Sequence, residues 1–188
     1  ELSYMVNKID EDRIKDDIEQ SKLSDVDIVV VFIHWGNEYQ REPSEKQIEL
    51  GRKMVEWGAN IVFGSHPHVI QRTEIINYQG KDNFIIYSMG NFLSNQRKET
   101  MDNRYTEDGI MVKIQLEKDF SKGQTIIKNI TYIPTWVRRY RDNNGLKYEI
   151  LPVSDFIGDE ELLSQIYDSE KLRIKESFKD TMGIMTEY

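Results

Sequence analysis

The sequence predicts an α/β fold built around a parallel sheet, and three neighbouring segments indicate it. Val26 to Ile33 is a nearly unbroken apolar run rich in β-branched residues, typical of a strand buried on both faces of such a sheet. A helical segment starts at Ser44, and a second apolar strand covers Ile61 to Phe63. A strand–helix–strand unit with a crossover of this length pairs its two strands in parallel.

Capping residues mark the ends of the helices that belong to this unit. Residues 10–22 are predicted to form a helix that Asp10 caps. Ser44 and Gln47 match a capping box at the start of the second helix, and Gly58 stands where a helix commonly ends.

The remainder of the chain alternates in the manner of antiparallel strands. Residues 94–108 are polar without a clear period and are interpreted as a surface loop. The expected elements are strands Glu74 to Tyr78 and Phe84 to Tyr87 joined through Gly80, strands Ile110 to Leu116 and Thr125 to Ile133, strands Val137 to Tyr140 and Lys147 to Val153, and a closing helix Asp159 to Lys179.

Composition excludes several classes of protein and site. The net charge of −8 argues against a nucleic-acid binder, and a polyanionic partner would need a local basic patch. Without Cys there are no disulfides or thiolate metal sites. The longest apolar run is far short of the roughly 20 residues that span a bilayer, and no signal peptide is visible. The chain opens at Glu1 rather than Met, which we interpret as a processed or truncated product.

All three histidines of the chain follow the two predicted parallel strands. His34 comes directly after the first strand, and His66 and His68 come just after the second. Parallel sheets gather ligands at the carboxyl ends of their strands, so these side chains should converge on one edge. Pro67 favours an extended backbone at His66, which would place both imidazoles of the pair on one side. We weigh a metal or phosphate site against polar residues that simply satisfy a turn; imidazole together with carboxylates suits Mn, Zn or Fe.

Three ordered motifs carry a resemblance to a known family. Residues 34–39 (H-W-G-N-E-Y), 64–69 (G-S-H-P-H-V) and 87–92 (Y-S-M-G-N-F) resemble the H-W-G-x-E-Y, G-x-H-P-H-V and Y-S-L-G-N-F motifs of the CapA (PgsA) family of poly-γ-glutamate capsule biosynthesis. Met89 replaces the Leu of the last motif. The match is close over about residues 10–93 and weak thereafter.

The resemblance implies both a fold and a ligand set. The family is related to calcineurin-like metallophosphoesterases, which implies a four-layer α/β/β/α sandwich of which this chain is the C-terminal portion. Within residues 1–188, we expect a core motif region at 10–93, a β-rich region at 94–155 and a terminal helix at 156–188. By the same resemblance His34, His66 and His68 are metal ligands. The other ligand motifs of the family are not in this chain, so we expect the site to need the missing N-terminal half of the domain.

Other polar residues are candidates for contact with a substrate. Glu38 would act as a general base or as a partner of a ligating histidine, in catalysis shared with His34; the alternative is one more exposed acid. Asn91 would supply an amide near the metals. Arg139 and Arg141 share a strand face and would pair with the carboxylates of the polymer, although surface ion pairs are the plainer explanation.

Two classes of function remain open at this point. The resemblance implies a component that makes, exports or anchors poly-γ-glutamate at the cell surface, with the polymer and the membrane components of the capsule synthase as partners. The alternative is a metal-dependent hydrolase that acts on a phosphoester or an amide bond. In either case an extracytoplasmic or membrane-associated location is expected for the full-length protein, and the fold alone does not choose between them.

Overall fold

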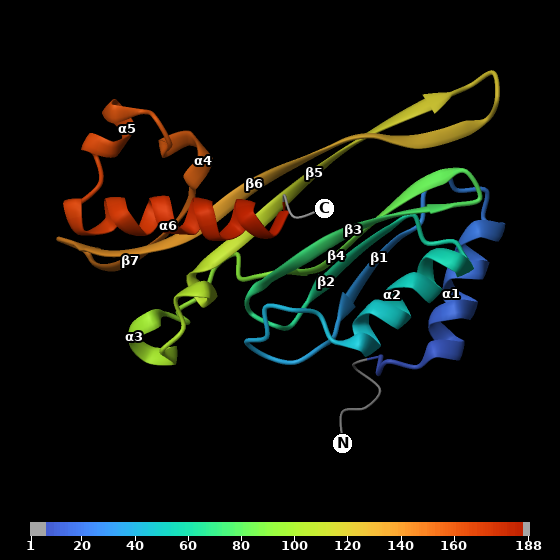
Figure 1. The fold of residues 1–188 in the computed structure, drawn as a ribbon, viewed down its shortest axis with the longest axis horizontal. Coiled ribbons are helices and arrows are strands. Elements are labelled where there is room, and N and C mark those ends of the chain that lie inside the picture. Colours follow the sequence, from blue (N-terminus) through green and yellow to red (C-terminus); the bar gives the residue numbers. More distant parts are fainter. Residues whose placement is uncertain (1–6, 186–188) are drawn as a thin grey trace.

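The computed structural model describes residues 7–185, which form two β-sheets flanked by helices (Figure 1). The α/β class expected from the sequence is confirmed, and the expected range 1–188 extends at both ends beyond the described residues. In chain order the elements are α1 (Glu11–Leu23), β1 (Val30–His34), α2 (Glu45–Trp57), β2 (Ile61–Ser65), β3 (Ile70–Tyr78), β4 (Lys81–Met89), α3 (Lys98–Met101), the 3₁₀ helix η1 (Arg104–Glu107), β5 (Asp108–Asp119), β6 (Gln124–Asp142), β7 (Gly145–Pro152), α4 (Val153–Phe156), α5 (Glu160–Ser164) and α6 (Asp168–Met185).

The first sheet contains the predicted parallel unit. Its strand order is β1-β2-β4-β3, with β1, β2 and β4 parallel and β3 antiparallel to β4. Val30 pairs with Ile61, and His34 pairs with Ser65, so the strands that carry the histidines are direct neighbours in register. The two-residue turn between β3 and β4 has positive φ at Gln79 and Gly80, which suits the twist of a tight hairpin.

Helices α1 and α2 cover one face of this sheet. The Asp10 side chain accepts a hydrogen bond from the backbone N–H of Arg13, and Ser44 and Gln47 form the predicted capping box. Gly58 ends α2 with φ at +122°. Buried residues from both helices join the sheet in one apolar core that includes Ile18, Leu50, Met54, Val62 and Tyr87.

The second sheet is a long antiparallel ribbon in the order β5-β6-β7. Its central strand β6 is continuous over 19 residues, whereas the sequence had predicted two separate strands on either side of Pro134. Pro134 pairs with Ile110 of β5, and the pairing with β7 begins only at Thr135. At Pro134 the strand is thus paired with β5 alone, and a proline is tolerated more readily where a strand has a neighbour on one side than in the middle of a sheet.

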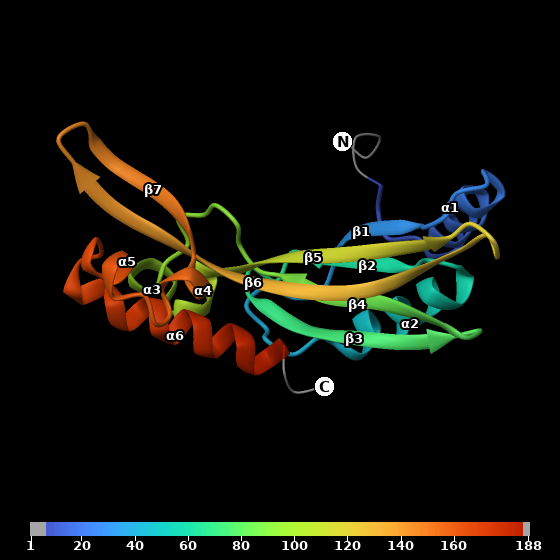
Figure 2. The same cartoon turned by 90° about the horizontal axis from the view of Figure 1, so that it is seen from above.

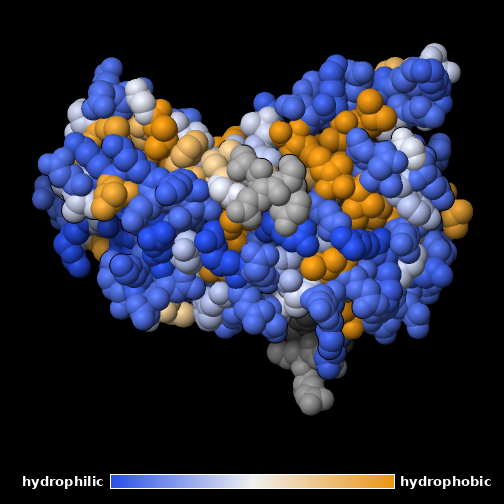
Figure 3. Space-filling model, in the orientation of Figure 1, coloured by the Kyte–Doolittle hydropathy of each residue, from blue (hydrophilic) through white to orange (hydrophobic). Residues whose placement is uncertain are grey.

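The ribbon of β5 and β6 lies over the other face of the first sheet (Figures 1 and 2). Apolar residues of both sheets meet between them, among them Ile61, Phe84, Ile86 and Ile110, with Met185 of α6 in the same cluster. Figure 3 shows apolar residues gathered between the ribbon and the sheet below it, in an otherwise mostly hydrophilic surface. The central strands β2 and β4 are buried on both faces. The expectation that the run before His34 is buried on both faces was wrong, because β1 is an edge strand whose Val30 and Phe32 are exposed.

Two expectations about the second half of the chain were wrong. Residues 94–108 are not a surface loop, because Arg97, Glu107 and Asp108 are buried there and two short helices form. The closing helix is not continuous either: α5 ends at Ser164, and α6 starts at Asp168 after a break. Within residues 7–185, no helix has both the length and the apolar character that a membrane crossing requires.

Candidate functional site

The three imidazole rings gather at the carboxyl ends of β1 and β2. His34 is the last residue of β1, and His66 and His68 lie in the bend that follows β2. The ring centres of His34 and His66 are 4.5 Å apart, and those of His66 and His68 are 6.2 Å apart. The convergence predicted from the spacing is thereby confirmed, while the role of these rings as ligands stays a prediction.

Hydrogen bonds tie the two loops that carry the rings to each other. The N–H of Trp35 donates to the carbonyl of Ser65 over 3.0 Å, and the N–H of Tyr39 donates to the carbonyl of Pro67 over 2.7 Å. The indole N–H of Trp35 reaches across β2 to the carbonyl of Tyr87 at 2.8 Å. Only a glycine leaves room for this crossing: a Cβ on Gly64 would stand 2.5 Å from the indole nitrogen.

The backbone of the histidine pair is turned rather than extended. Both His66 and His68 have positive φ, at +102° and +60°, so the extended conformation expected from Pro67 is wrong at this point. Each such residue costs of order 1–3 kcal/mol and persists only where its surroundings impose it. Tyr39, which is bonded to Pro67, also has positive φ, so both facing loops are held in unfavourable conformations. Strained residues of this kind concentrate at binding and active sites.

The partner of His68 fixes which ring nitrogen carries the proton. Its Nδ1 lies 3.0 Å from the Oδ1 of Asn91. The amide nitrogen of Asn91 is already used as a donor to Gln96 and to the carbonyl of Thr106, so its Oδ1 is an acceptor. Neutral His68 therefore carries its proton on Nδ1 and presents a lone pair at Nε2. Histidines that bind metal through Nε2 are commonly oriented by such an Nδ1–H bond.

His34 has a comparable partner in Ser65, which sequence reasoning missed. The hydroxyl of Ser65 lies 3.3 Å from Nδ1 of His34 and also 3.3 Å from the carbonyl of Ile33. If the hydroxyl donates to that carbonyl, Nδ1–H of His34 donates to Ser65 and Nε2 is again left with its lone pair. Desolvation, followed by the positive charge that His66 and His68 would add, lowers the pKa of His34 and favours the neutral ring. The available signal was the position of Ser65 directly before His66, because the parallel register places it opposite His34.

Glu38 and Tyr39 border the cluster from the loop after β1. The Oε1 of Glu38 is 3.8 Å from Nε2 of His68, and its side chain is half exposed. The ring of Tyr39 stacks on that of His68 at 6.0 Å between centres. Glu38 is thus placed beside a histidine, as either a ligand or a base would be, and its role stays a prediction.

These side chains do not make up a complete metal centre by themselves. Among residues 7–185, no group of three or more His, Asp and Glu side chains is arranged so that it would hold a metal ion. Three imidazoles and one carboxylate also fall short of the ligands that a dinuclear site requires. Two of the rings have a hydrogen-bond partner at Nδ1, and the metal-binding role of the three histidines stays a prediction.

The predicted polymer-contacting arginines lie away from the histidines. Arg139 and Arg141 are on β6 and line a cavity between β6, α3 and α6, together with Arg97, which sequence reasoning had left in a surface loop. Arg138, which directly precedes Arg139 in β6, is largely buried and pairs with Glu170 at 3.0 Å. Burial of Arg97 and Arg138 depends on contacts with distant segments, so no local pattern could have indicated it.

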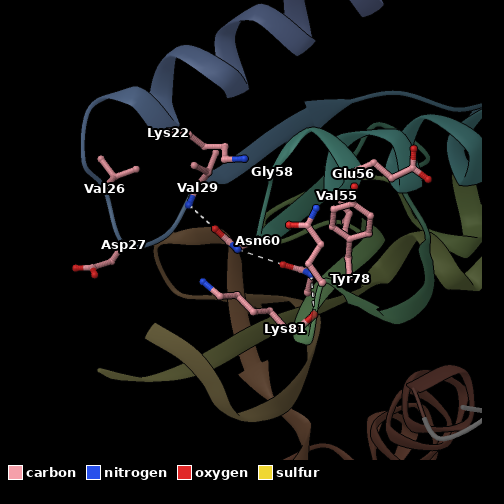
Figure 4. Close-up of a pocket in the computed structure, with 12 residues that line it drawn as sticks. Lys22, Val26, Asp27, Val29, Val55, Glu56, Gly58, Asn60, Tyr78 and Lys81 are labelled. Carbon is pink, nitrogen blue, oxygen red and sulfur yellow. Dashed lines mark hydrogen bonds between the residues drawn. The ribbon is translucent and has the colours of Figure 1, made fainter. Parts of the chain in front are cut away.

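A further cavity of about 260 Å³ lies at the other end of the sheet, where the parallel strands begin (Figure 4). Asn60 accepts a hydrogen bond from the N–H of Val29 and donates to Asn83, which in turn donates to the carbonyls of Ile76 and Lys81. Because these amides satisfy one another, they hold the starts of the parallel strands together and serve the fold.

We call the sheet edge that carries His34, His66 and His68 the histidine edge. Comparison with known proteins places it within a region that a family model matches. A family model described as bacterial capsule synthesis protein PGA_cap matches residues 2–96. The chain is similar to "PGA biosynthesis protein CapA" of Bacillus subtilis (strain 168), with 40% identity over 93 residues, which are 50% of this chain and 22% of that protein. It is also similar to "Capsule biosynthesis protein CapA" of Bacillus anthracis, with 44% identity over 75 residues, 40% of this chain and 17% of that protein. The matches thus span about a fifth of the length of these relatives.

Proposed function

Because the chain belongs to the bacterial capsule synthesis protein family, we propose that it is part of a protein that makes, exports or anchors poly-γ-glutamate at the cell surface. Family membership supports the capsule role, and the relatives named above carry that role in their names. One observation supports a chemical site within this capsule role: three imidazole rings converge at the carboxyl ends of two paired parallel strands. The full-length protein would act outside the cytoplasm, at the membrane or cell surface.

We propose that His34, His66 and His68 supply part of a site for Mn, Zn or Fe. The Nδ1 partners Asn91 and Ser65 support this, because they leave the Nε2 lone pairs of two rings free for a cation. The carboxylates still required would come from parts of the relatives that this chain does not match. In that larger protein the two sheets and α1–α2 would form part of an α/β/β/α sandwich of the metallophosphoesterase type.

A metal-dependent hydrolase is the second candidate, favoured by the strained loops around the rings. When bound, the metal would supply an activated water for attack on a phosphoester or amide bond. In this proposal Glu38, whose Oε1 lies 3.8 Å from Nε2 of His68, would accept a proton, and His34 and His66 would hold the cation. A binding or anchoring component would need the same side chains for affinity alone.

The capsule role is tested with single-residue variants of the full-length protein in a capsule-forming cell. His34→Ala and His66→Ala should abolish capsule formation, while Asn37→Ala, an exposed residue of the same loop, should leave the yield unchanged. Normal capsule yield from both histidine variants, at normal protein levels, would refute a role for this edge. Purified protein that turns over a phosphoester or amide substrate, and loses this turnover with His66→Ala, would select the hydrolase.

The incomplete metal site has its own test on the 188-residue chain. Calorimetric titration with Mn²⁺ or Zn²⁺ should give weak binding that His68→Ala removes. Tight binding of two ions to this chain alone would contradict the need for ligands from elsewhere.

A further inference from the structure

Basic side chains concentrate in one cleft of this acidic protein. The cleft has a volume of about 510 Å³ and lies where β6 passes α3 and α6 (left side of Figure 1). We call it the arginine cleft, and its basic lining residues are Arg97, Lys98, Arg104, Arg139, Arg141 and Arg173. Six of the 25 Lys and Arg residues therefore face one cavity, in a chain of net charge −8. Every residue that lines it lies beyond residues 2–96, which the family model matches.

Some of these cations are committed to the fold. Arg97 donates to the buried carboxylate of Glu107 at 3.0 Å and to the carbonyl of Val137 at 2.7 Å. Arg104 binds Asp180 of α6 at 2.8 Å. These two guanidinium groups hold the walls of the cleft in place.

Other cations of the cleft have capacity left for a ligand. Within residues 7–185, the side chains of Lys98 and Arg141 make no hydrogen bond or ion pair. Arg139 has only a 3.4 Å bond to Asn95 and an exposed Glu99 at 3.9 Å. Arg173 is not among them, because its Nη2 donates to Asp108 at 2.6 Å and to the carbonyl of Arg104 at 2.8 Å.

The spacing of the free cations suits a row of carboxylates. Arg139 and Arg141 are alternate residues of β6, so they share a face and stand about 7 Å apart. A guanidinium binds a planar carboxylate through two parallel N–H···O hydrogen bonds. Arg139 and Arg141 could each bind a carboxylate in this way, and no metal is needed for it. The cleft is also lined by Glu99, Glu107, Glu170 and Glu176, which repel any polyanion and act more strongly on a densely charged phosphate polymer than on a polymer with one carboxylate per residue.

One short segment connects the arginine cleft to the histidine edge. Asn91 contacts His68, and Asn95 accepts hydrogen bonds from Arg139 and from the hydroxyl of Tyr148. Four residues span at most about 14 Å even when fully extended. A flexible polymer held at Arg139 would therefore reach the histidines within a few of its residues.

We propose that the arginine cleft binds a run of carboxylates of poly-γ-glutamate and directs the polymer toward the histidine edge. This rests on the proposed capsule function and adds the place where the substrate is held. Arg139 and Arg141 make the carboxylate contacts, and Lys98 extends the positive wall. Because the contacts are between charges at a partly open surface, affinity falls as salt is added.

Binding of fluorescently labelled poly-γ-glutamate to the 188-residue chain tests this by anisotropy at low salt. The double variant Arg139→Glu/Arg141→Glu should bind about tenfold more weakly or worse, as expected for the loss of two exposed charge pairs. The control Lys46→Glu/Lys113→Glu changes the net charge equally, at exposed positions outside the cleft, and should bind as the parent does. Urea midpoints of both double variants show whether either has lost its fold, and Arg141→Gln alone, which breaks no contact, should still weaken binding severalfold.

Three outcomes would overturn the inference. They are no polymer binding by the parent chain, equal loss in both double variants, and equal or tighter binding of inorganic polyphosphate as competitor. His34→Ala should retain polymer binding in this assay. A chain that fails to bind polymer while capsule yield still depends on the histidines would reject the arginine cleft and leave the capsule role standing.

Discussion

Gly64→Ala should be among the most damaging single-methyl additions in this protein. Gly64 lies in β2, two residues before His66, where the indole of Trp35 crosses the strand to reach Tyr87. A Cβ there would stand 2.1 Å from the carbonyl oxygen of Tyr87 and 2.5 Å from the indole nitrogen. Since carbon and oxygen normally approach to about 3.3 Å, β4 must shift by about 1 Å, and the indole must move as well.

The free-energy loss has two parts. Forcing a methyl group into a packed core costs about 1–3 kcal/mol. Displacing the indole breaks its 2.8 Å bond to Tyr87, and loss of a buried hydrogen bond costs about another 1–3 kcal/mol. We expect the free energy of unfolding to fall by about 4 kcal/mol, which for a chain of this length lowers Tm by roughly 8–16 °C.

Urea unfolding followed by tryptophan fluorescence measures this loss. The matched control is Gly183→Ala in α6, where a Cβ meets nothing within 4 Å and should stabilise the helix by up to about 1 kcal/mol. Trp35→Phe removes the same hydrogen bond, so the two changes combined should cost less than their sum. A loss below about 1 kcal/mol for Gly64→Ala would show that the strands relax freely, and the account of the crossing would then be wrong.

Three further outcomes follow from named contacts. Asn91→Ala removes the acceptor at Nδ1 of His68 and should weaken Mn²⁺ or Zn²⁺ binding by the full-length protein about 10–100-fold in calorimetry; unchanged affinity would reject the orienting role. Glu107→Gln removes the buried charge that pairs with Arg97 and should lower the free energy of unfolding, measured in urea, by about 3 kcal/mol. A loss under about 1 kcal/mol would show that the Arg97–Glu107 pair contributes little to stability. Burial raises the pKa of Asp108 to about 6, so the folded chain keeps a proton that the unfolded chain releases near pH 3.8. The free energy of unfolding should therefore fall as pH rises from about 4 to 6. Asp108→Asn should remove this part of the dependence of stability on pH. A slope that is the same in the parent and in Asp108→Asn would contradict this.

Local signals were enough to predict the part of the fold that carries the histidines. The β-branched run before His34, the capping box at Ser44 and the stop at Gly58 each act through neighbouring residues, so each is visible in the chain itself. Together they predicted a parallel strand pair, and the parallel topology alone brings His34 next to the pair that follows β2. Their orientation was not predictable, because it depends on Asn91 and Ser65 and on positive φ at His66 and His68.

The second half of the chain depends on contacts between distant segments. Residues 94–108 have no periodicity, yet Arg97 is buried, because Glu107 and the carbonyl of Val137 accept hydrogen bonds from its guanidinium group. Residues 125–133 and 137–140 were expected to form separate strands, but β6 continues through both, paired first with β5 and then also with β7. Polar composition indicates exposure only on average, and a buried charge is stable only when tertiary structure supplies its partner.

By itself the sequence determined the class of fold, the family and the edge of the sheet at which the three histidines meet, because strand direction and spacing are local properties of the chain. Only the tertiary structure decided which nitrogen of His68 is free and which arginines line a common cleft. The proton position on a ring and the burial of a guanidinium depend on partners from other elements, and those partners come together only when the two sheets pack.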